Sequence, residues 1–329
     1  MQHPGTTMSP SATRTLRTNV MSDPTRLAAY NQMVKDTSLS YQPKAIQDVC
    51  IGYGGKGKGH EELTKDGEQA YRSAIIFLVS NDKSYVRMVL DILSAWSTKN
   101  KTFTGDNAPL EAAWSICSMA RAAELIRHTL EWQTSTVPKS FFRWLDERVM
   151  QHLTNESVWK WKFRNNWHFS IICARMQLAI LRDNKLEFEW AVTAYRNSLP
   201  QAICQGHPCH TSETKRDLTH VQFLLGGIIQ AAEMAFHQNV TDLYDDRLHP
   251  IIEYHASLLL KEVPPGISAE DIKTPYGYWN EPIWELALVH FRGRKGLPMP
   301  KTESNVQRSR PERVTFHWGG GTITHYKII

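Results

Sequence analysis

The fold is decided by the stretch DGEQAYRSAIIFLVS-NDK-SYVRMVLDILSAWS, which covers residues 66–97. On either side of NDK, apolar residues recur at the three- and four-residue spacing of an amphipathic helix. The NDK segment between them has the composition of a turn. The stretch therefore predicts two helices joined by a tight turn, which is an antiparallel helical hairpin.

The same helical spacing continues along most of the chain. PLEAAWSICSMARAAELIRHTL (109–130) begins with a proline, which suits a helix start, and is apolar on several faces, which is typical of a buried helix. No convincing strand interrupts the pattern between Thr64 and Phe291. The sequence thus predicts an all-α fold of antiparallel hairpins, either closed into a toroid or stacked as a solenoid. No motif of about 34 or 40 residues recurs, which argues against a regular repeat array. Further helices are predicted at Phe141–Leu153, Trp167–Leu181, Leu186–Ile203, Arg216–Phe236, Leu243–Leu260 and Pro282–Phe291.

The two ends of the chain have a different composition. Residues 1–60 are rich in Gly, Pro and Ser and are expected to be mostly loop. Within them GYGGKGKGH (52–60) lacks the residue order of a phosphate-binding P-loop, so we interpret it as a surface or lid loop. Residues 295–329 are expected to be loop with one or two short strands. No linker divides the chain, so the prediction is a single domain over residues 1–329.

Composition limits the partners. The chain is 41% hydrophobic and 22% charged, and its formal net charge of +5 mildly favours an anionic partner. No run approaches the roughly 18 apolar residues of a membrane span. No Lys/Arg-rich block indicates nucleic acid. We therefore expect neither a membrane nor a nucleic acid as partner, and composition does not fix an oligomeric state.

Short cysteine and glycosylation motifs bear on the compartment. CQGHPC (204–209) is compatible with a small disulfide loop, or with a Cys/His metal cluster that includes His207 and His210. No second Cys/His cluster completes a structural zinc set, so the metal is the less favoured of the two. The sequons at Asn155 and Asn239 are compatible with a secreted protein, although no secretory signal is present at Met1. We expect an extracellular protein.

A polar and aromatic cluster precedes the helix predicted from Trp167. Asn is a good helix N-cap, which explains one of Asn165 and Asn166 but not both. The second carboxamide, with Arg164 and His168 beside it, is more than a buried helix start requires. Carboxamide donors at a helix N-terminus suit a carboxylate, so the cluster predicts an anion-binding site.

Two further stretches carry candidate chemistry. In SETKRDLTHVQFLLGG (212–227), Arg216 and His220 are four residues apart and would share one face of a helix. Arginine can hold a carboxylate and histidine can move a proton near neutral pH. The plain alternative is a surface pair bound to Glu213 or Asp217. The loop TPYGYWNEP (274–282) supplies Tyr276, Tyr278 and Trp279, as a stacking surface or as a packed turn.

Taken in order along the chain, these segments resemble the alginate-lyase-like polysaccharide lyases with an α/α-toroid fold, most closely those of family 38. The resemblance covers nearly the whole chain. Each piece is short, but their collinear order is fairly specific. The segments that carry it are HPG (3–5), DGEQAY, ILSAWS, AAWSICSMARAAELIR (112–127), NNW (165–167), KRDLTHVQFLLGGIIQAAEMAFHQNVTDLYDDRL (215–248), PIWELALVHFRGRKGLP (282–298) and GGGTITHY (319–326).

The resemblance implies β-elimination of an acidic polysaccharide such as alginate or glucuronan, without a metal or other cofactor. Such an enzyme neutralises the uronate carboxylate, removes the C5 proton and protonates the leaving O4. By position, Asn166 and Arg216 would neutralise the carboxylate and His220 would accept the proton. The resemblance further implies a catalytic tyrosine at Tyr276. Residues implied to bind substrate are Trp114, Arg164, Asn165, Trp167, His168 and Tyr278.

The chain also departs from the family pattern. Glu281 stands where an arginine is expected, Lys215 where a glycine is expected, and Leu288 where a tyrosine is expected. These departures leave two other functions open. One is a glycoside hydrolase on a similar toroid, with Glu213 and Glu281 as its carboxylates. The other is a degenerate lyase that binds glycans without cleaving them.

Overall fold

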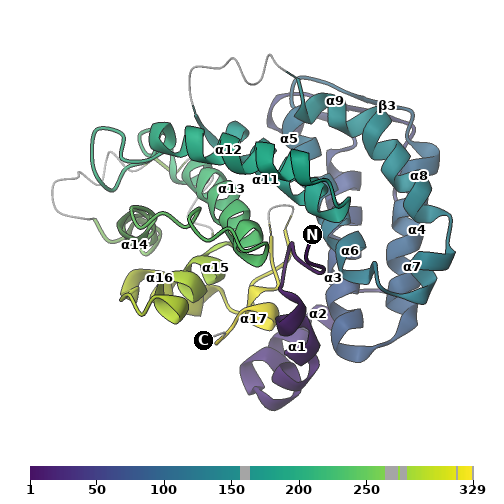
Figure 1. The fold of residues 1–329 in the computed structure, drawn as a ribbon, viewed down its shortest axis with the longest axis horizontal. Helices are drawn as coiled ribbons and strands as arrows, with labels where there is room; N and C mark the ends of the chain where they lie inside the picture. The colour runs from purple at the N-terminus through teal and green to yellow at the C-terminus, as the bar shows by residue number, and fades with distance from the viewer. Residues whose placement is uncertain (156–163, 264–272, 275–279, 316–317, 328–329) are drawn as a thin grey trace.

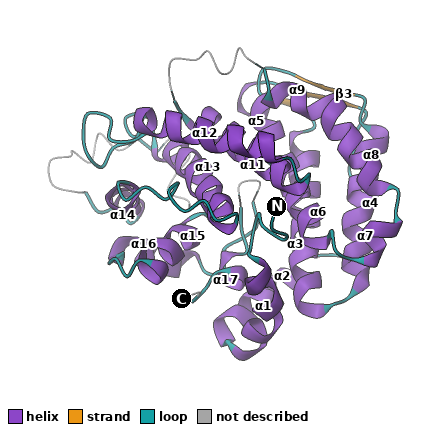
Figure 2. Ribbon diagram, in the orientation of Figure 1, coloured by secondary structure: helices purple, strands orange, loops and turns teal. Residues whose placement is uncertain are grey.

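Helices form nearly all of the regular structure in the computed structural model, which describes residues 1–155, 164–263, 273–274, 280–315 and 318–327 (Figures 1 and 2). The prediction of an all-α fold is therefore confirmed. The α-helices are α1 (Pro10–Ser22), α2 (Pro24–Lys35), α3 (His60–Ser80), α4 (Lys83–Lys99), α5 (Ala108–Ala113), α6 (Ser115–Ile126), α7 (Leu130–Thr134), α8 (Val137–Trp144), α9 (Met150–Leu153), α11 (Asn166–Leu181), α12 (Lys185–Ala202), α13 (Leu218–His237), α14 (Leu248–Leu259), α15 (Trp284–Leu288), α16 (Pro300–Ser309) and α17 (Gly321–Thr324).

The stretch at 66–97 forms the predicted hairpin of α3 and α4. Asn81 ends α3 in the left-handed conformation, with φ of 62°. The carboxylate of Asp82 then accepts a hydrogen bond from the Ser84 N–H (2.8 Å) and caps α4. The turn residues thus satisfy backbone groups that both helix ends would otherwise leave without partners.

Successive helices follow an arc that forms an α/α toroid, and the N-terminus lies inside this arc (Figure 1). Helix α11 divides the interior. Its Ile171, Ala174 and Leu178 belong to a core built by helices α1 to α9. Its Phe169, Ile172 and Met176 belong to a second core, built with helices α12 to α16. All sixteen residues of α11 are buried, because the helix has a core on two sides.

Small non-α elements complete the described part. A three-stranded sheet has the order β2 (Gly57–Lys58), β1 (Asp48–Ile51), β3 (Thr102–Thr104). β1 pairs antiparallel with β2 and parallel with β3. The glycine stretch 52–60 is therefore a short hairpin with a 3₁₀ turn, η1 (Tyr53–Gly55). π-helical turns η2 (Leu145–Val149) and η4 (Val289–Arg294) extend α8 and α15. Among the described residues, no helix has the length and apolarity needed to cross a membrane.

Several boundaries differ from the prediction. The expectation of loop over residues 1–60 is wrong at α1 and α2, because Ser9 and Asp23 cap these helices and a proline starts each. Residues 295–329 contain α16 and α17, and no strand occurs in the described part of that segment. Helix α14 begins five residues later than the predicted Leu243, and α15 begins at Trp284 instead of Pro282. Within the described residues between Thr64 and Phe291, the predicted absence of strands fails only at the three-residue β3.

Candidate active site

The two asparagines at the start of α11 have different tasks. Asn165 is the N-cap, and its Oδ1 accepts a hydrogen bond from the Trp167 N–H (3.1 Å). Asn166 is 1% exposed, and its backbone N–H donates to Glu213 Oε1 (3.3 Å). The Asn166 Oδ1 is buried and has no hydrogen-bond partner among the described residues. Because buried polar atoms are nearly always paired, this orphaned oxygen marks a place where a ligand can bind.

Arg164 and His168 form a pair beside the asparagines. The Arg164 guanidinium Nη1 donates to His168 Nε2 (2.8 Å), and His168 Nδ1 lies 3.5 Å from Asn165 Oδ1. Burial and the neighbouring Arg164 lower the pKa of His168 to about 4, so the ring is neutral at neutral pH. A neutral His168 can accept from Arg164 and hold that cation in place. Ser212 Oγ donates to the Arg164 carbonyl (2.8 Å) and joins this cluster to the loop before α13.

The loop before α13 supplies two carboxylates and an arginine. Arg216 Nη1 lies 3.5 Å from Glu213 Oε2, and its Nε lies 3.9 Å from Asp217 Oδ2. Glu213 therefore contacts both Arg216 and the backbone N–H of Asn166. The prediction that this helix begins at Arg216 is wrong, because Asp217 is the N-cap and α13 begins at Leu218. Arg216 and His220 thus do not share a helix face, and the ion pairs with Glu213 and Asp217 are those of the plain alternative.

His220 is bound to the N-cap of its own helix. The Asp217 Oδ1 accepts the backbone N–H of His220 (2.8 Å). The imidazole Nδ1 lies 2.9 Å from Oδ1 and 2.8 Å from Oδ2 of the same carboxylate. Both side chains are mostly buried, with 16% of His220 and 7% of Asp217 exposed. The ring is therefore held in one orientation at the first turn of α13.

Trp114 closes the site from the side of α5 and α6. It lies at the break between these helices, and its Nε1–H donates to Ser170 Oγ of α11 (2.8 Å). Its indole centroid is 5.0 Å from that of Phe223, which in turn packs edge-on against the His220 ring at 5.7 Å. These contacts link Asn166, Glu213, Arg216, Asp217, His220, Phe223, Trp114 and Ser170 in order, and helix α11, which holds both Asn166 and Ser170, closes the circuit.

The remaining candidates are less informative. Trp167 is only 8% exposed, so little of its indole is available to stack on a sugar. Tyr276, Tyr278 and Trp279 lie outside the described residues. Leu288 is packed in the core, and Lys215 is exposed on the loop before α13. Phe223 and Ser170 are not predictable as site residues, since neither residue type carries a chemical signal by itself.

The two carboxylates of the hydrolase alternative have separate surroundings. Glu213 belongs to the circuit just described. Glu281 is 1% exposed; its backbone N–H donates to Gln222, and its Oε2 accepts a hydrogen bond from Thr315 Oγ1. Burial raises the pKa of Glu281 to about 8.

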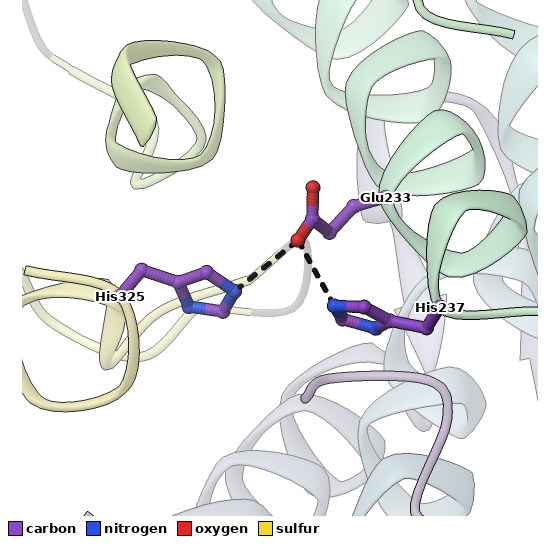
Figure 3. A group of neighbouring side chains, drawn as sticks. All are labelled: Glu233, His237 and His325. Atoms are coloured by element: carbon purple, nitrogen blue, oxygen red, sulfur yellow. Dashed lines mark ion pairs between the residues drawn. The ribbon is translucent and has the colours of Figure 1, made fainter. Parts of the chain in front are cut away.

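One group of described side chains has the spacing of metal ligands, and it is remote from CQGHPC. It consists of Glu233 and His237 of α13 and of His325 (Figure 3). His237 Nε2 lies 3.0 Å and His325 Nε2 lies 3.8 Å from Glu233 Oε1. Arg294 already binds both oxygens of this carboxylate, at 2.6 and 2.8 Å. Since that cation balances the only carboxylate of the group, we interpret it as a buried ion network. Cys204 and Cys209 are free thiols.

Comparison with known proteins places this geometry in context. The alginate lyase family matches residues 21–262 of the chain. Alginate lyase A1-III from Sphingomonas species A1 has a similar fold, with a TM-score of 0.71 and 14% identity over 99% of this chain and 100% of that one. An alginate lyase from Bacteroides ovatus gives 0.70 and 12% over 99% and 100%. A histidine-to-alanine variant of A1-III complexed with a tetrasaccharide gives 0.70 and 13% over 98% of both chains. No curated protein matches the chain.

Proposed function

Because this chain belongs to the alginate lyase family and is a polysaccharide lyase, we propose that it cleaves a polyuronate, of the alginate or glucuronan type, by β-elimination. The observation that carries the proposal is the circuit in which the starts of α11 and α13 bring together Asn166, Arg216 and His220. Because the sequons at Asn155 and Asn239 are compatible with a secreted protein, we also propose an extracellular place of action.

The first requirement of the reaction is a site for the uronate carboxylate. Neutralising this group makes the C5 proton acidic enough to remove. Asn166 offers a buried carboxamide at a helix N-terminus, where partial positive charge also favours an anion. Arg216 has a 48% exposed side chain, and its guanidinium makes no hydrogen bond to a described residue, only the two longer ion pairs. Its donors therefore remain for a ligand. Both residues contact Glu213, so we propose that they lie close enough to bind the same substrate carboxylate.

The second requirement is proton transfer. His220 is the proposed acceptor of the C5 proton, since a neutral imidazole is the usual general base near neutral pH. As the C5–H bond breaks, its electrons form the C4–C5 double bond and the C4–O4 bond breaks. The departing O4 then needs a proton, which we assign to Tyr276, with Tyr278 as the second choice. Trp114, Arg164, Asn165, Trp167, His168 and Tyr278 are the proposed substrate-binding residues.

The test is incubation of the purified protein with alginate, with glucuronan and with an uncharged glucan as control. Elimination gives an unsaturated uronate that absorbs in the ultraviolet and is lighter by one water than a hydrolysis product. We expect this product from a polyuronate and none from the glucan. Saturated products would indicate a hydrolase, and an absence of any product from the polyuronates would contradict the proposal.

Two variants test the residues. His220→Ala should lower the rate roughly 10²–10⁴-fold, the usual contribution of a positioned acid–base group. His210→Ala is the matched control, because His210 lies on the neighbouring loop and contacts Tyr254, outside the circuit. Asn166→Ala should lower kcat more than it raises KM, since carboxylate neutralisation is strongest in the transition state. Full activity in His220→Ala would refute its role as the base.

A further inference from the structure

Asp217 has more contacts than a helix cap needs. An N-cap requires one acceptor for a backbone N–H of the first turn, and Ser, Thr or Asn serves as well as Asp. Asp217 Oδ1 performs this task for the His220 N–H (2.8 Å). The carboxylate also lies 2.8 and 2.9 Å from the Nδ1 of the His220 ring, and the Asp217 side chain is only 7% exposed.

The chain contains a second cap with the same spacing, and it serves as an internal comparison. Asn165 caps α11, and His168 follows three residues later, as His220 follows Asp217. At α11 the cap is neutral and the ring nitrogen is 3.5 Å from it, while the other ring nitrogen accepts from Arg164. At α13 the cap is charged and the contact is at hydrogen-bond distance. The same local fold thus carries different electrostatics at the two helix starts.

We propose that Asp217 is the positioning residue that prepares His220 as the base. A carboxylate at Nδ1 keeps the proton on that nitrogen and leaves Nε2 with its lone pair as the proton acceptor. When Nε2 takes the C5 proton, the ring becomes an imidazolium, and the adjacent carboxylate stabilises this charge without itself taking a proton. The inference rests on the proposed function, because it assumes that His220 removes the C5 proton.

The variant Asp217→Asn tests this role with little change of shape. Asn is also a good N-cap, so its Oδ1 can keep the backbone N–H of His220. The amide nitrogen then faces the ring Nδ1 and donates to it, which moves the ring proton to Nε2 and removes the acceptor. We expect kcat to fall roughly 10²–10⁴-fold with KM nearly unchanged. Asp82→Asn is the matched control, because Asp82 caps α4 without a histidine contact and should leave kcat unchanged.

Two readouts separate this proposal from the proposed function. Long-range proton–nitrogen NMR of histidine-labelled protein should show the His220 proton on Nδ1 in the natural protein and on Nε2 in Asp217→Asn, whether or not a substrate is cleaved. The double variant Asp217→Asn/His220→Ala should be no slower than His220→Ala, since both changes remove one function. If the natural protein is active, any one of three results would overturn the role of Asp217. These are an undiminished kcat in Asp217→Asn, additive losses in the double variant, and a His220 proton on Nε2 in the natural protein. An inactive natural protein would instead overturn the proposed function.

Discussion

Glu281 stands where the family resemblance led us to expect an arginine, and its surroundings explain how the chain tolerates a carboxyl there. The side chain is 1% exposed and accepts a hydrogen bond from Thr315 Oγ1 (3.2 Å), while its backbone N–H donates to Gln222 (2.9 Å). Burial raises the pKa of Glu281 to about 8. At pH 7 the folded protein therefore keeps this group protonated and avoids a buried negative charge.

Glu281→Gln should stabilise the protein at pH 8 and not at pH 4.5. In the unfolded chain the carboxyl loses its proton near pH 4.5, whereas in the folded protein it keeps it up to about pH 8. The contribution of this group to the free energy of unfolding is therefore complete below pH 4.5 and decreases as the pH rises to 8. Glutamine does not titrate, so the gain should reach a few kcal/mol at pH 8, at about 1.4 kcal/mol per unit of pKa shift. Urea unfolding at both pH values measures it, and an equal effect at both would contradict the prediction.

At this scale, sequence indicates residue types better than partners. Asn166 stands out in the sequence because capping explains only one of two adjacent asparagines; in the structure its Oδ1 has no partner among the described residues, and its predicted role toward a carboxylate stays a prediction. The contact between Glu213 and Asn166 could not be predicted, because it joins residues 47 positions apart. The predicted helix start at Arg216 is wrong, because the helical spacing of apolar residues begins only after Asp217. An Asp three residues before His220 is itself a signal for a helix N-cap.

At the scale of elements, the site depends on the close approach of α11 and α13. Gly227 of α13 lies against the backbone of Phe169 on α11. A Cβ added at Gly227 would lie 2.7 Å from the Phe169 carbonyl carbon and 2.9 Å from its oxygen. The pair of helices can pack at this distance only because position 227 has no side chain. The spacing in turn fixes how far Asn166, at the start of α11, lies from His220, at the start of α13.

Gly227→Ala should therefore force α11 and α13 apart. Alanine by itself favours a helix interior by about 1 kcal/mol over glycine. The clash with backbone atoms, which cannot rotate away, should outweigh this and cost about 1–3 kcal/mol net. Chemical denaturation measures the loss, and the lyase assay should show a lower kcat because the proposed catalytic groups move apart. Unchanged or increased stability would show that the helices adjust without strain.

The long helices were predictable and the short ones at the chain ends were not. α3, α4 and α13 carry many apolar residues at helical spacing, and this signal does not depend on distant contacts. α1 and α2 are not predicted because the Gly, Pro and Ser content of residues 1–60 is typical of loops. Pro10 and Pro24 in fact occupy first-turn positions behind the caps Ser9 and Asp23. Ser9 and Asp23 are recognisable cap residues in the sequence, but the overall composition of residues 1–60 favours the prediction of a loop.

At the scale of the whole molecule, charged and polar contacts join distant segments of the toroid. His3 reaches Glu124 of α6 (2.9 Å) and Asp183 after α11 (2.7 Å). Near the other end of the chain, Arg26 of α2 donates to the Ile323 carbonyl (3.0 Å). The Glu233 carboxylate contacts Arg294, His237 and Tyr244; Figure 3 shows Glu233 with His237 and His325. These contacts tie the two halves on either side of α11 to the ends of the chain.

Arg294→Met should be strongly destabilising. Glu233 is fully buried, and Arg294 binds both of its oxygens (2.6 and 2.8 Å), so removal of the cation leaves an unpaired buried charge. We expect a loss of about 3–5 kcal/mol, and a smaller loss in Arg294→Met/Glu233→Gln, where no charge is left unpaired. Arg196→Met is the matched control, because Arg196 forms the same two-bond contact with Asp242 at the surface and should lose less than about 1 kcal/mol. Equal losses in Arg294→Met and Arg196→Met by urea unfolding would contradict this account.

The pH dependence of folding should report another set of buried groups, the histidines that the folded protein keeps neutral. Burial lowers the pKa of His168, His255 and His290 to about 4. The unfolded chain binds protons at these sites below about pH 6.5, before the folded protein does, so the free energy of unfolding should fall as pH drops from about 6.5 to 4. His3 and His60 have raised pKa values and act in the opposite direction.

His255, fully buried between the Ile251 carbonyl and Thr214, should contribute up to about 3 kcal/mol to this pH dependence. Urea unfolding of His255→Gln across this range should show a shallower slope, by close to one proton at its steepest, and an unchanged slope would mean that His255 is not the group that titrates.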